Sequence, residues 1–334
     1  MLAGPPRRVL VLRALQLGDL LRAVPALRAM RRAWPHATIG LIGLPWARAL
    51  VDRLPGYVDE LHEFPGWPGV PEAPFEPARS IAFLERLGRE RADLAIQLHG
   101  SGVHTNAFVA LLGAARTVGT YLPGTIPPAG GAFVPLDETA SETRRCLAVL
   151  EPLGVRPAGT RLELEVHGRD HDDADRALHR AGAGEAIADG YAIVHAGGRS
   201  ARRWPAARFA AVADALADDV PVVLTGTAEE RPVGDEIAAR MGRPVIDLVG
   251  STSMGALFAL VRDARVVVSN DTGVSHVADA LGVPSVVVYT TSDATRWAPE
   301  DRDLHRVVVG VAEAPEVIAQ ARELLVSSRS GSAR

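Results

Sequence analysis

The chain has 334 residues, of which 47% are hydrophobic and 5% aromatic, and its formal net charge is -4. Length and composition predict a packed protein of two domains, with neither the basic surface nor the aromatic platform that nucleic-acid binding requires. All 36 basic residues are arginine, so a bound phosphate would have to be held by guanidinium or backbone N–H groups. The single cysteine, Cys146, excludes an intrachain disulfide and fits a reducing compartment.

The beginning of the chain does not resemble a secretory signal. Pro-rich, basic residues 1–8 precede an apolar run, 9–12, that is too short for the core of a signal peptide. The sequence also lacks an uninterrupted apolar stretch near the length of a membrane span. We therefore expect a cytoplasmic protein, and we leave open a peripheral position at the inner face of the membrane.

Short β-branched runs alternate with amphipathic stretches, which predicts parallel βαβ units. In the first half, we expect strands at 8–12, 38–44 and 93–98, and helices at 19–33, 104–113 and 142–153. The segment 64–77 is rich in Pro, Gly and aromatic residues and is expected to be a loop. The polar, Gly-rich segment 154–190 indicates a domain boundary.

In the second half, we expect strands at 191–195, 220–224, 266–269 and 285–289, and helices at 206–217, 254–263, 275–281 and 316–326. Helix 206–217 carries Phe209, Val212, Ala213 and Leu216 at the spacing of one buried face. The expected divisions are an N-terminal domain 1–160, an interdomain linker region 161–189, a C-terminal domain 190–312, a C-terminal helix 313–327 and a tail 328–334.

The first candidate site is the turn Leu17-Gly18-Asp19, between a predicted strand and a predicted helix. Ligands of open parallel sheets bind beyond the carboxyl ends of the strands, and Gly18 permits close approach of a ligand. Asp19 would then lie at the mouth of the site. The alternative, which local sequence favours, is that Asp19 is the N-cap of its helix.

The second candidate runs from His195 to Pro205, where a strand leads into Gly197-Gly198 and then into a loop with three arginines. Glycine-rich turns expose N–H groups, and arginines add charge-assisted bonds to phosphate. The segment matches neither a Walker loop nor a complete G-x-G-x-x-G pattern. A solvated surface turn is the alternative.

The third candidate is the segment Ser269 to His276, which joins a β-branched run to a helix. The free N–H groups and the dipole of a helix N-terminus attract anions. The alternative is ordinary helix capping by Asp271 or Thr272. Neighbouring Ser275 and His276 do not form a nucleophile pair, because adjacent side chains on a helix diverge.

A polar cluster in the boundary region has the composition of a metal site. It consists of His167, Asp170, His171, Asp172 and Asp173. The spacing matches no pattern of metal ligands, and a polar loop with an acidic helix start explains the cluster equally well. We therefore expect no metal site.

Taken in order, these segments resemble glycosyltransferase family 9, the heptosyltransferase family, over nearly the whole chain. The resemblance rests on GDLLRAVPALRAMRRAWPHATIGLIG, ADLAIQLHGS, RTVGTYLPG, GGRSARRWPAARFAAVADAL, LTGTAEE, DLVGSTSMGAL and VVVSNDTGVSHVADALGVPSVVVY. It implies the GT-B fold, two Rossmann-like, doubly wound parallel-sheet domains facing a cleft. The N-terminal half would bind the acceptor and the C-terminal half the nucleotide sugar.

The resemblance also implies roles for particular residues. Asp19 would be the general base, and Gly18, Arg22 and His99 would lie on the acceptor side. The expected donor-binding residues are Gly197, Gly198, Arg199, Ser200, Arg202, Glu229, Glu230, Ser253, Met254, Asp271, Thr272, Gly273 and His276. Among them, Arg202 would contact phosphate, and Asp271 would cap its helix rather than touch phosphate as an anion.

The implied activity is an inverting transfer of heptose or a similar sugar from an ADP-linked or other nucleotide-diphosphate sugar to a glycan or glycolipid hydroxyl. No cofactor, metal or nucleic acid is expected to take part. Arg22, Arg28, Arg31 and Arg32 predict a basic helix face that could meet an anionic glycolipid at the cytoplasmic face of a membrane; a solvated face is the alternative.

Departures from the family pattern at Gln16-Leu17, Arg22-Ala23 and Thr290-Thr291 concern the acceptor and the sugar. Two rival functions stay open, a nucleotide-sugar epimerase or phosphorylase on the same scaffold and a nucleotide-sugar-binding protein without catalysis. A dinucleotide-dependent enzyme is disfavoured, since the sequence lacks the glycine fingerprint.

Overall fold

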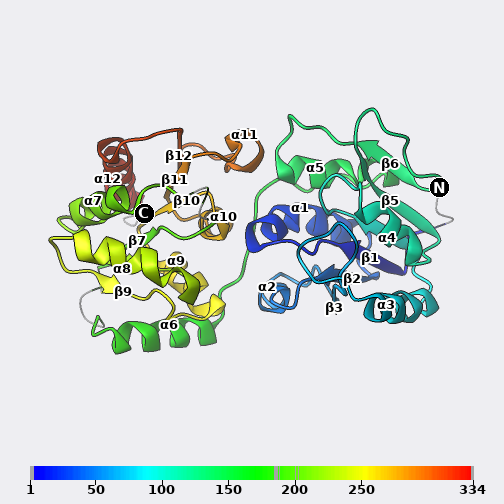
Figure 1. The fold of residues 1–334 in the computed structure, drawn as a ribbon, viewed down its shortest axis with the longest axis horizontal. Coiled ribbons are helices and arrows are strands. Elements are labelled where there is room, and N and C mark those ends of the chain that lie inside the picture. Colours follow the sequence, from blue (N-terminus) through cyan, green and yellow to red (C-terminus); the bar gives the residue numbers. More distant parts are fainter. Residues whose placement is uncertain (1–3, 184–186, 188, 200, 202, 332–334) are drawn as a thin grey trace. The chain divides into compact units, whose positions relative to one another are not determined.

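The computed structural model describes residues 4–183, 187, 189–199, 201 and 203–331. The chain divides into two compact units, Met1–Leu162 and Glu163–Arg334. Each unit contains one six-stranded sheet in which the neighbouring strands pair in parallel. In Figure 1 the first unit runs from blue to green and the second from green to red. The alternating pattern of the sequence therefore produces two separate α/β sheets, as predicted.

The first unit has the strand order β3-β2-β1-β4-β5-β6. Its elements are β1 (Arg8–Leu12), α1 (Leu17–Ala33), β2 (Thr38–Gly43), α2 (Ala47–Val51), β3 (Glu60–Glu63), α3 (Pro77–Arg89), β4 (Leu94–Gln97), α4 (Thr105–Leu111), β5 (Arg116–Tyr121), β6 (Ala132–Pro135), α5 (Glu142–Ala148) and the 3-10 helix η1 (Glu151–Leu153). The chain order reverses between β1 and β4, which makes that point the topological switch of the sheet.

The second unit repeats this topology with the order β12-β11-β10-β7-β8-β9. Its elements are α6 (Gly168–Arg180), β7 (Ala192–His195), α7 (Ala206–Leu216), β8 (Val222–Leu224), the 3-10 helix η3 (Ala228–Glu230), α8 (Arg231–Arg240), β9 (Ile246–Asp247), α9 (Met254–Asp263), β10 (Val266–Asn270), α10 (Gly273–Leu281), β11 (Ser285–Tyr289), α11 (Ala294–Trp297), β12 (His305–Val309) and α12 (Ala314–Gly331). Its switch point lies between β7 and β10.

The central strands are buried on both faces, which explains their continuous apolar sequences. In the first unit, Leu10 and Leu12 pack in one cluster with α3 and α4 side chains. In the second unit, alternate residues of β7, β8, β10 and β11 pack against α7, α8 and α12. The predicted inner face of α7 is confirmed, since Phe209, Val212, Ala213 and Leu216 are all buried.

The central elements were predicted, and α9 and β11 have the predicted bounds. The outermost strands β3, β6, β9 and β12 were not predicted, because they are short and only partly buried and so lack a strong apolar run. Strand β5 and helices α3 and α8 were also missed. The single helix predicted at 142–153 was wrong: α5 ends at Ala148, four residues before Pro152, whose ring would clash with that carbonyl group.

The predicted linker, 161–189, is the largest departure from expectation. Residues 168–180 form α6, which belongs to the second unit and packs against α9. Helix α6 has a narrow buried face made of Ala174, Ala177 and Leu178. This face was not recognised in the sequence, because polar residues surround it. The tail prediction also fails at 328–331, which continue α12. Among the helices described, none is both long and apolar enough to cross a membrane.

Candidate active site

The switch point of the second sheet brings two of the sequence candidates together. Asn270, at the end of β10, is 1% exposed. Its amide nitrogen donates to the carbonyl oxygens of Ala196 and Gly197, both at 3.0 Å, and its oxygen accepts the Trp204 N–H at 2.8 Å. One buried side chain therefore ties the turn after β7 to the end of β10. Asn270 was part of a predicted segment, but its role was not predicted.

Both glycines of the turn are required by their surroundings. A Cβ on Gly197 would overlap the carboxylate of Glu230. Gly198 has a φ of +114°, where other residues are strained, and a Cβ there would lie 2.5 Å from Cγ2 of Thr272. The turn after β7 and the start of α10 therefore approach each other as closely as backbone allows.

Glu230 braces this turn from the other side. Its carboxylate, in a residue only 9% exposed, accepts the backbone N–H groups of Gly198 and, at 2.8 Å, of Thr227. Arg203 donates from Nε to the Gly198 carbonyl at 2.7 Å and places Nη2 3.9 Å from Glu230. Glu230 therefore braces the turn, and its predicted contact with the donor stays a prediction. Glu229 is exposed, and hydrogen bonds from its own backbone N–H and from Thr227 lower the pKa of its carboxyl group.

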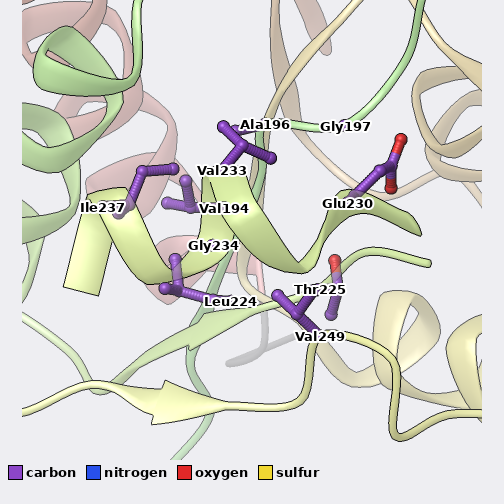
Figure 2. Close-up of a pocket in the computed structure, with 10 residues that line it drawn as sticks. All are labelled: Val194, Ala196, Gly197, Leu224, Thr225, Glu230, Val233, Gly234, Ile237 and Val249. Atoms are coloured by element: carbon purple, nitrogen blue, oxygen red, sulfur yellow. The ribbon is translucent and has the colours of Figure 1, made fainter. Parts of the chain in front are cut away.

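A small cavity lies beneath the turn, between β7, β8 and α8 (Figure 2). It has a volume of about 10 Å³, room for about one water molecule, so it cannot be the nucleotide site. Glu230 and Thr225 lie at one end of it. His195 Nδ1 is 3.0 Å from Thr225 Oγ1 and its Nε2 is 4.0 Å from Glu230. Burial lowers the pKa of His195 despite the attraction of Glu230, so the imidazole is neutral near pH 7.

The N-cap residue of α10 is Thr272, one of the two capping residues expected, but its side chain makes no cap hydrogen bond within the described part of the chain. The Thr272 hydroxyl is buried without a hydrogen-bond partner among the described residues. Asp271 instead places Oδ1 3.8 Å from Nε2 of His276, whose ring centre lies 6.2 Å from that of Trp297. Asp271 and His276 are both almost fully buried.

Of the other predicted donor residues, some are described and some lie outside the described part. Ser253 is the N-cap of α9: its hydroxyl accepts the Ala256 N–H at 3.1 Å and lies 3.3 Å from Asp173, and its contact with the donor stays a prediction. Met254 begins that helix and is partly exposed. Arg199 is exposed, and Ser200 and Arg202 lie outside the described residues.

The polar cluster at the start of α6 has structural contacts. His167 and Asp170 form a capping box, and His171 Nδ1 lies 3.2 Å from Asp263. Within the described ranges, ligand atoms lie close enough together for a metal ion at a different place, namely Glu60, His62 and Glu90. The guanidinium group of Arg8 already pairs with both of these carboxylates, so a cation occupies that position.

In the first unit, α1 begins at Leu17 with Gln16 as its N-cap residue. Asp19 therefore lies in the first turn of the helix, and the alternative that it is the cap was wrong. Its side chain is 23% exposed, and its backbone carbonyl accepts two hydrogen bonds from Arg13, at 3.1 and 2.7 Å. Arg13 also pairs with Glu142 at 2.9 Å. Neither Arg13 nor Glu142 was predicted as a neighbour of Asp19, although an arginine directly after the apolar run 9–12 is an unusual feature.

His99 follows β4, beside this cluster in the fold. Its Nδ1 accepts the Ala14 N–H at 3.2 Å, which leaves the ring proton on Nε2, 3.8 Å from Glu72. Burial, reinforced by the positive charge of Arg13, lowers the pKa of His99 to about 3. The imidazole is therefore neutral at physiological pH and serves as a hydrogen-bonding group rather than a charge. The carboxyl edge of this sheet thus contains both Asp19 and His99, and the acceptor-side role of His99 stays a prediction.

The predicted basic face of α1 is not a free arginine surface. Arg22 and Gly18 are buried. Arg28 donates to the carbonyl oxygens of Gly159 and Arg161, and Arg31 pairs with Asp59 at 2.5 Å. These arginines contact their own unit, and Arg32 is left exposed.

A larger cavity, about 220 Å³, lies at the carboxyl ends of β5 and β6 in the first unit. Its lining combines apolar side chains with charges of both signs: Thr120, Val134, Pro135, Leu136, Asp137, Ala140, Arg144, Arg145, Ala148 and Glu151. This composition suits a ligand with both hydroxyl groups and apolar faces. This cavity was not predicted from the sequence.

Comparisons with known proteins agree with this arrangement. The model of glycosyltransferase family 9 (heptosyltransferase) matches residues 138–326. Lipopolysaccharide heptosyltransferase 3 of Escherichia coli is 28% identical over 209 residues, which cover 55% of this chain and 60% of that protein. The match thus spans about three fifths of the relative's length.

Two solved structures share the fold over both units. A glycosyl transferase family 9 protein from Veillonella parvula DSM 2008 has a TM-score of 0.80 at 22% identity, covering 96% of this chain and 97% of that one. ADP-heptose lps heptosyltransferase II of E. coli has a TM-score of 0.77 at 22% identity, covering 96% and 99%. The expected pair of Rossmann-like domains of the GT-B class is confirmed.

Proposed function

Because this chain belongs to glycosyltransferase family 9, the heptosyltransferase family, we propose that it transfers a sugar from a nucleotide-diphosphate sugar to a hydroxyl group of a glycan or glycolipid. One observation carries the proposal, the meeting of the Gly197-Gly198 turn with the start of α10 at the switch point of the second sheet. Backbone N–H groups and a helix N-terminus converge on such a point and suit a diphosphate.

The proposed donor is ADP-heptose or a similar nucleotide sugar. Its support is the family and the likeness of the fold to that of the E. coli ADP-heptose lps heptosyltransferase II. In the proposal, Arg202 and turn N–H groups other than that of Gly198 bind the diphosphate, while Arg203 and Glu230 hold the turn in place. Glu229, exposed at the start of η3, is the better candidate for an acidic donor contact.

Asp19 is proposed as the general base. The acceptor hydroxyl oxygen attacks the anomeric carbon of the donor sugar, and the bond from that carbon to the diphosphate oxygen breaks. The hydroxyl proton passes to the Asp19 carboxylate, and the nucleoside diphosphate leaves with the bonding electrons. A single displacement of this kind inverts the anomeric centre. A positioned base contributes about 10²–10⁴ in rate.

Charge on the departing diphosphate is proposed to be balanced by arginine and helix N-terminal N–H groups, so that no metal is required. An enzyme working in this way should turn over equally fast with and without a chelator. A rate that falls on chelation and returns with Mg²⁺ would contradict the metal-free proposal.

The proposed acceptor is a glycan or glycolipid bound by the first unit. The cavity beside β6 offers carboxylate and guanidinium groups for hydroxyls and apolar side chains for the faces of sugar rings. A glycolipid acceptor would place the enzyme at the cytoplasmic face of a membrane. Because the chain departs from the family pattern at Arg22-Ala23 and Thr290-Thr291, the identity of the acceptor and of the sugar is to be determined by experiment.

The first experiment is a thermal-shift screen with ADP-, GDP-, UDP- and dTDP-sugars. A ligand at 100 times its Kd stabilises the folded state by about 2.7 kcal/mol, so the true nucleotide should stand out. A product with inverted anomeric configuration, assigned by NMR, would support the displacement. Nucleotide binding without transfer would favour a binding protein, and conversion of the donor without an acceptor would favour an epimerase.

A further inference from the structure

Arg13 is the most deeply buried charged side chain near Asp19. It follows β1 directly and is 1% exposed. Its guanidinium group contacts three other segments: the first turn of α1, the carbonyl of Leu98 after β4, and Glu142 at the start of α5. A buried guanidinium group is costly unless its donors and its charge are satisfied. Glu142, only 3% exposed, supplies the opposite charge at 2.9 Å.

The bonds from Arg13 to Asp19 have a specific geometry. Nε and Nη2 both donate to the backbone carbonyl oxygen of Asp19, at 3.1 and 2.7 Å. The carboxylate oxygen Oδ1 is farther, 3.8 Å from Nη2, within ion-pair range but beyond a hydrogen bond. Arg13 therefore fixes the turn that carries Asp19 and places a positive charge beside the carboxylate, while its directional bonds go to the backbone.

Arg13 does not cap α1, because it donates to a carbonyl group, but it holds a first turn that lacks a side-chain cap among the described residues. The N-cap residue of α1, Gln16, makes no side-chain cap hydrogen bond within the described part of the chain. A first turn without a cap frays more readily than the rest of a helix. The Arg13 fork, planar and rigid, holds the carbonyl of Asp19 and that of Leu98 at the same time. The turn is thereby tied to the end of β4.

We propose that Arg13, held by Glu142, is a positioning residue that keeps Asp19 in the orientation needed to accept the acceptor's proton. The inference rests on the proposed function of Asp19. A lysine at this position would keep the charge but could not make the same set of bonds, because its single ammonium group lacks the fork. Small errors in the position of a base lower the rate strongly.

The first test needs no substrate. Amide hydrogen exchange is measured on the full chain for wild type, Arg13→Lys and the control Arg48→Lys, whose side chain is 55% exposed in the same unit. Exchange over residues 17–23 should rise at least about tenfold in Arg13→Lys only, because the turn opens locally. Unchanged exchange over residues 17–23 in Arg13→Lys would overturn the proposal that Arg13 holds the first turn of α1.

The second test measures turnover of ADP-heptose with lipopolysaccharide from a heptose-deficient strain, or ADP release by hydrolysis of that donor. Arg13→Lys should lower kcat about 10- to 100-fold while ADP affinity stays within about twofold of wild type. In an Asp19→Asn background the same change should have almost no further effect. Equal effects in both backgrounds would reduce Arg13 to a purely structural residue.

The two failures can be told apart. If Asp19→Asn turns over at the wild-type rate, the proposed base is wrong whatever the exchange data show. If Asp19→Asn is inactive but Arg13→Lys matches wild type, only the positioning role is wrong. Arg13→Met removes the cation nearest to Glu142 and leaves that buried carboxylate with the more distant Arg145, at 3.9 Å, so this variant could fail to fold. Arg13→Met with Glu142→Leu, which removes both charges of the close pair, therefore serves as the second variant. Its kcat should fall at least as far as that of Arg13→Lys, and wild-type turnover would overturn the proposal.

Discussion

Replacing Gly197 by alanine tests the bracing of the donor turn. The new Cβ would overlap the Glu230 carboxylate, so the carboxylate has to leave its position. It then loses the N–H groups of Gly198 and Thr227. Hydrogen bonds to a charged group contribute about 1.5–3 kcal/mol each, so two of them at the lower end amount to about 3 kcal/mol. For a domain of this size, that lowers the Tm by about 6–12 °C.

The assay is thermal unfolding followed by calorimetry, with ADP affinity measured by titration. Gly242→Ala is the matched control, because Gly242 is exposed in the same unit and an added Cβ there would meet Asp214 only at 3.6 Å. Its free energy of unfolding should stay within the range of ordinary surface changes, about 0.5 kcal/mol.

A double-mutant cycle identifies the cause. In a Glu230→Ala background the overlap is gone, so Gly197→Ala should lose at least about 1 kcal/mol of its effect. If Gly197→Ala and Gly242→Ala unfold at the same temperature, or if the two changes at Gly197 and Glu230 are additive, the bracing argument is refuted.

Three further predictions follow from the proposed chemistry and the burial of His99. Asp19→Asn should keep ADP affinity and lose about 10²–10⁴ in kcat; wild-type turnover would show that Asp19 is not the base. Arg202→Ala should weaken ADP binding by about 1.5–3 kcal/mol in calorimetry, whereas unchanged affinity for every nucleotide would remove Arg202 from the site. Because burial lowers the pKa of His99 to about 3, the unfolded chain binds the extra proton between pH 6.5 and 3, and stability falls as pH falls through that window. The loss approaches about 1.4 kcal/mol per pH unit, and His99→Gln should flatten an acid-denaturation series; an identical slope would contradict it.

The architecture could largely be predicted from local sequence. Fully buried parallel strands read as apolar runs, and β1, β7 and β10 were recognised in this way. Elements at the sheet edges and under polar surfaces were not predicted, because their burial depends on residues that are distant in the chain. Helix α6 is the clearest case: its buried face consists mainly of two alanines and a leucine among charged residues, and only α9 makes that face a core.

The candidate site, too, could be predicted only in part from local sequence. The sequence by itself determined where chemistry could occur, at Gly18-Asp19, Gly197-Gly198 and the Asp271–His276 segment, since glycines and polar residues after apolar strands mark the ligand-binding edge of a parallel sheet. It did not determine which polar side chain binds a ligand and which one holds the backbone. Long-range contacts give three side chains their structural roles: the contact of Glu230 spans 32 residues of chain, that of Asn270 spans 74, and that of Arg13 spans 85. Those contacts exist only once the strands are aligned, because hydrogen bonds act over about 3 Å and no local pattern records which distant carbonyl or N–H group will come within that range.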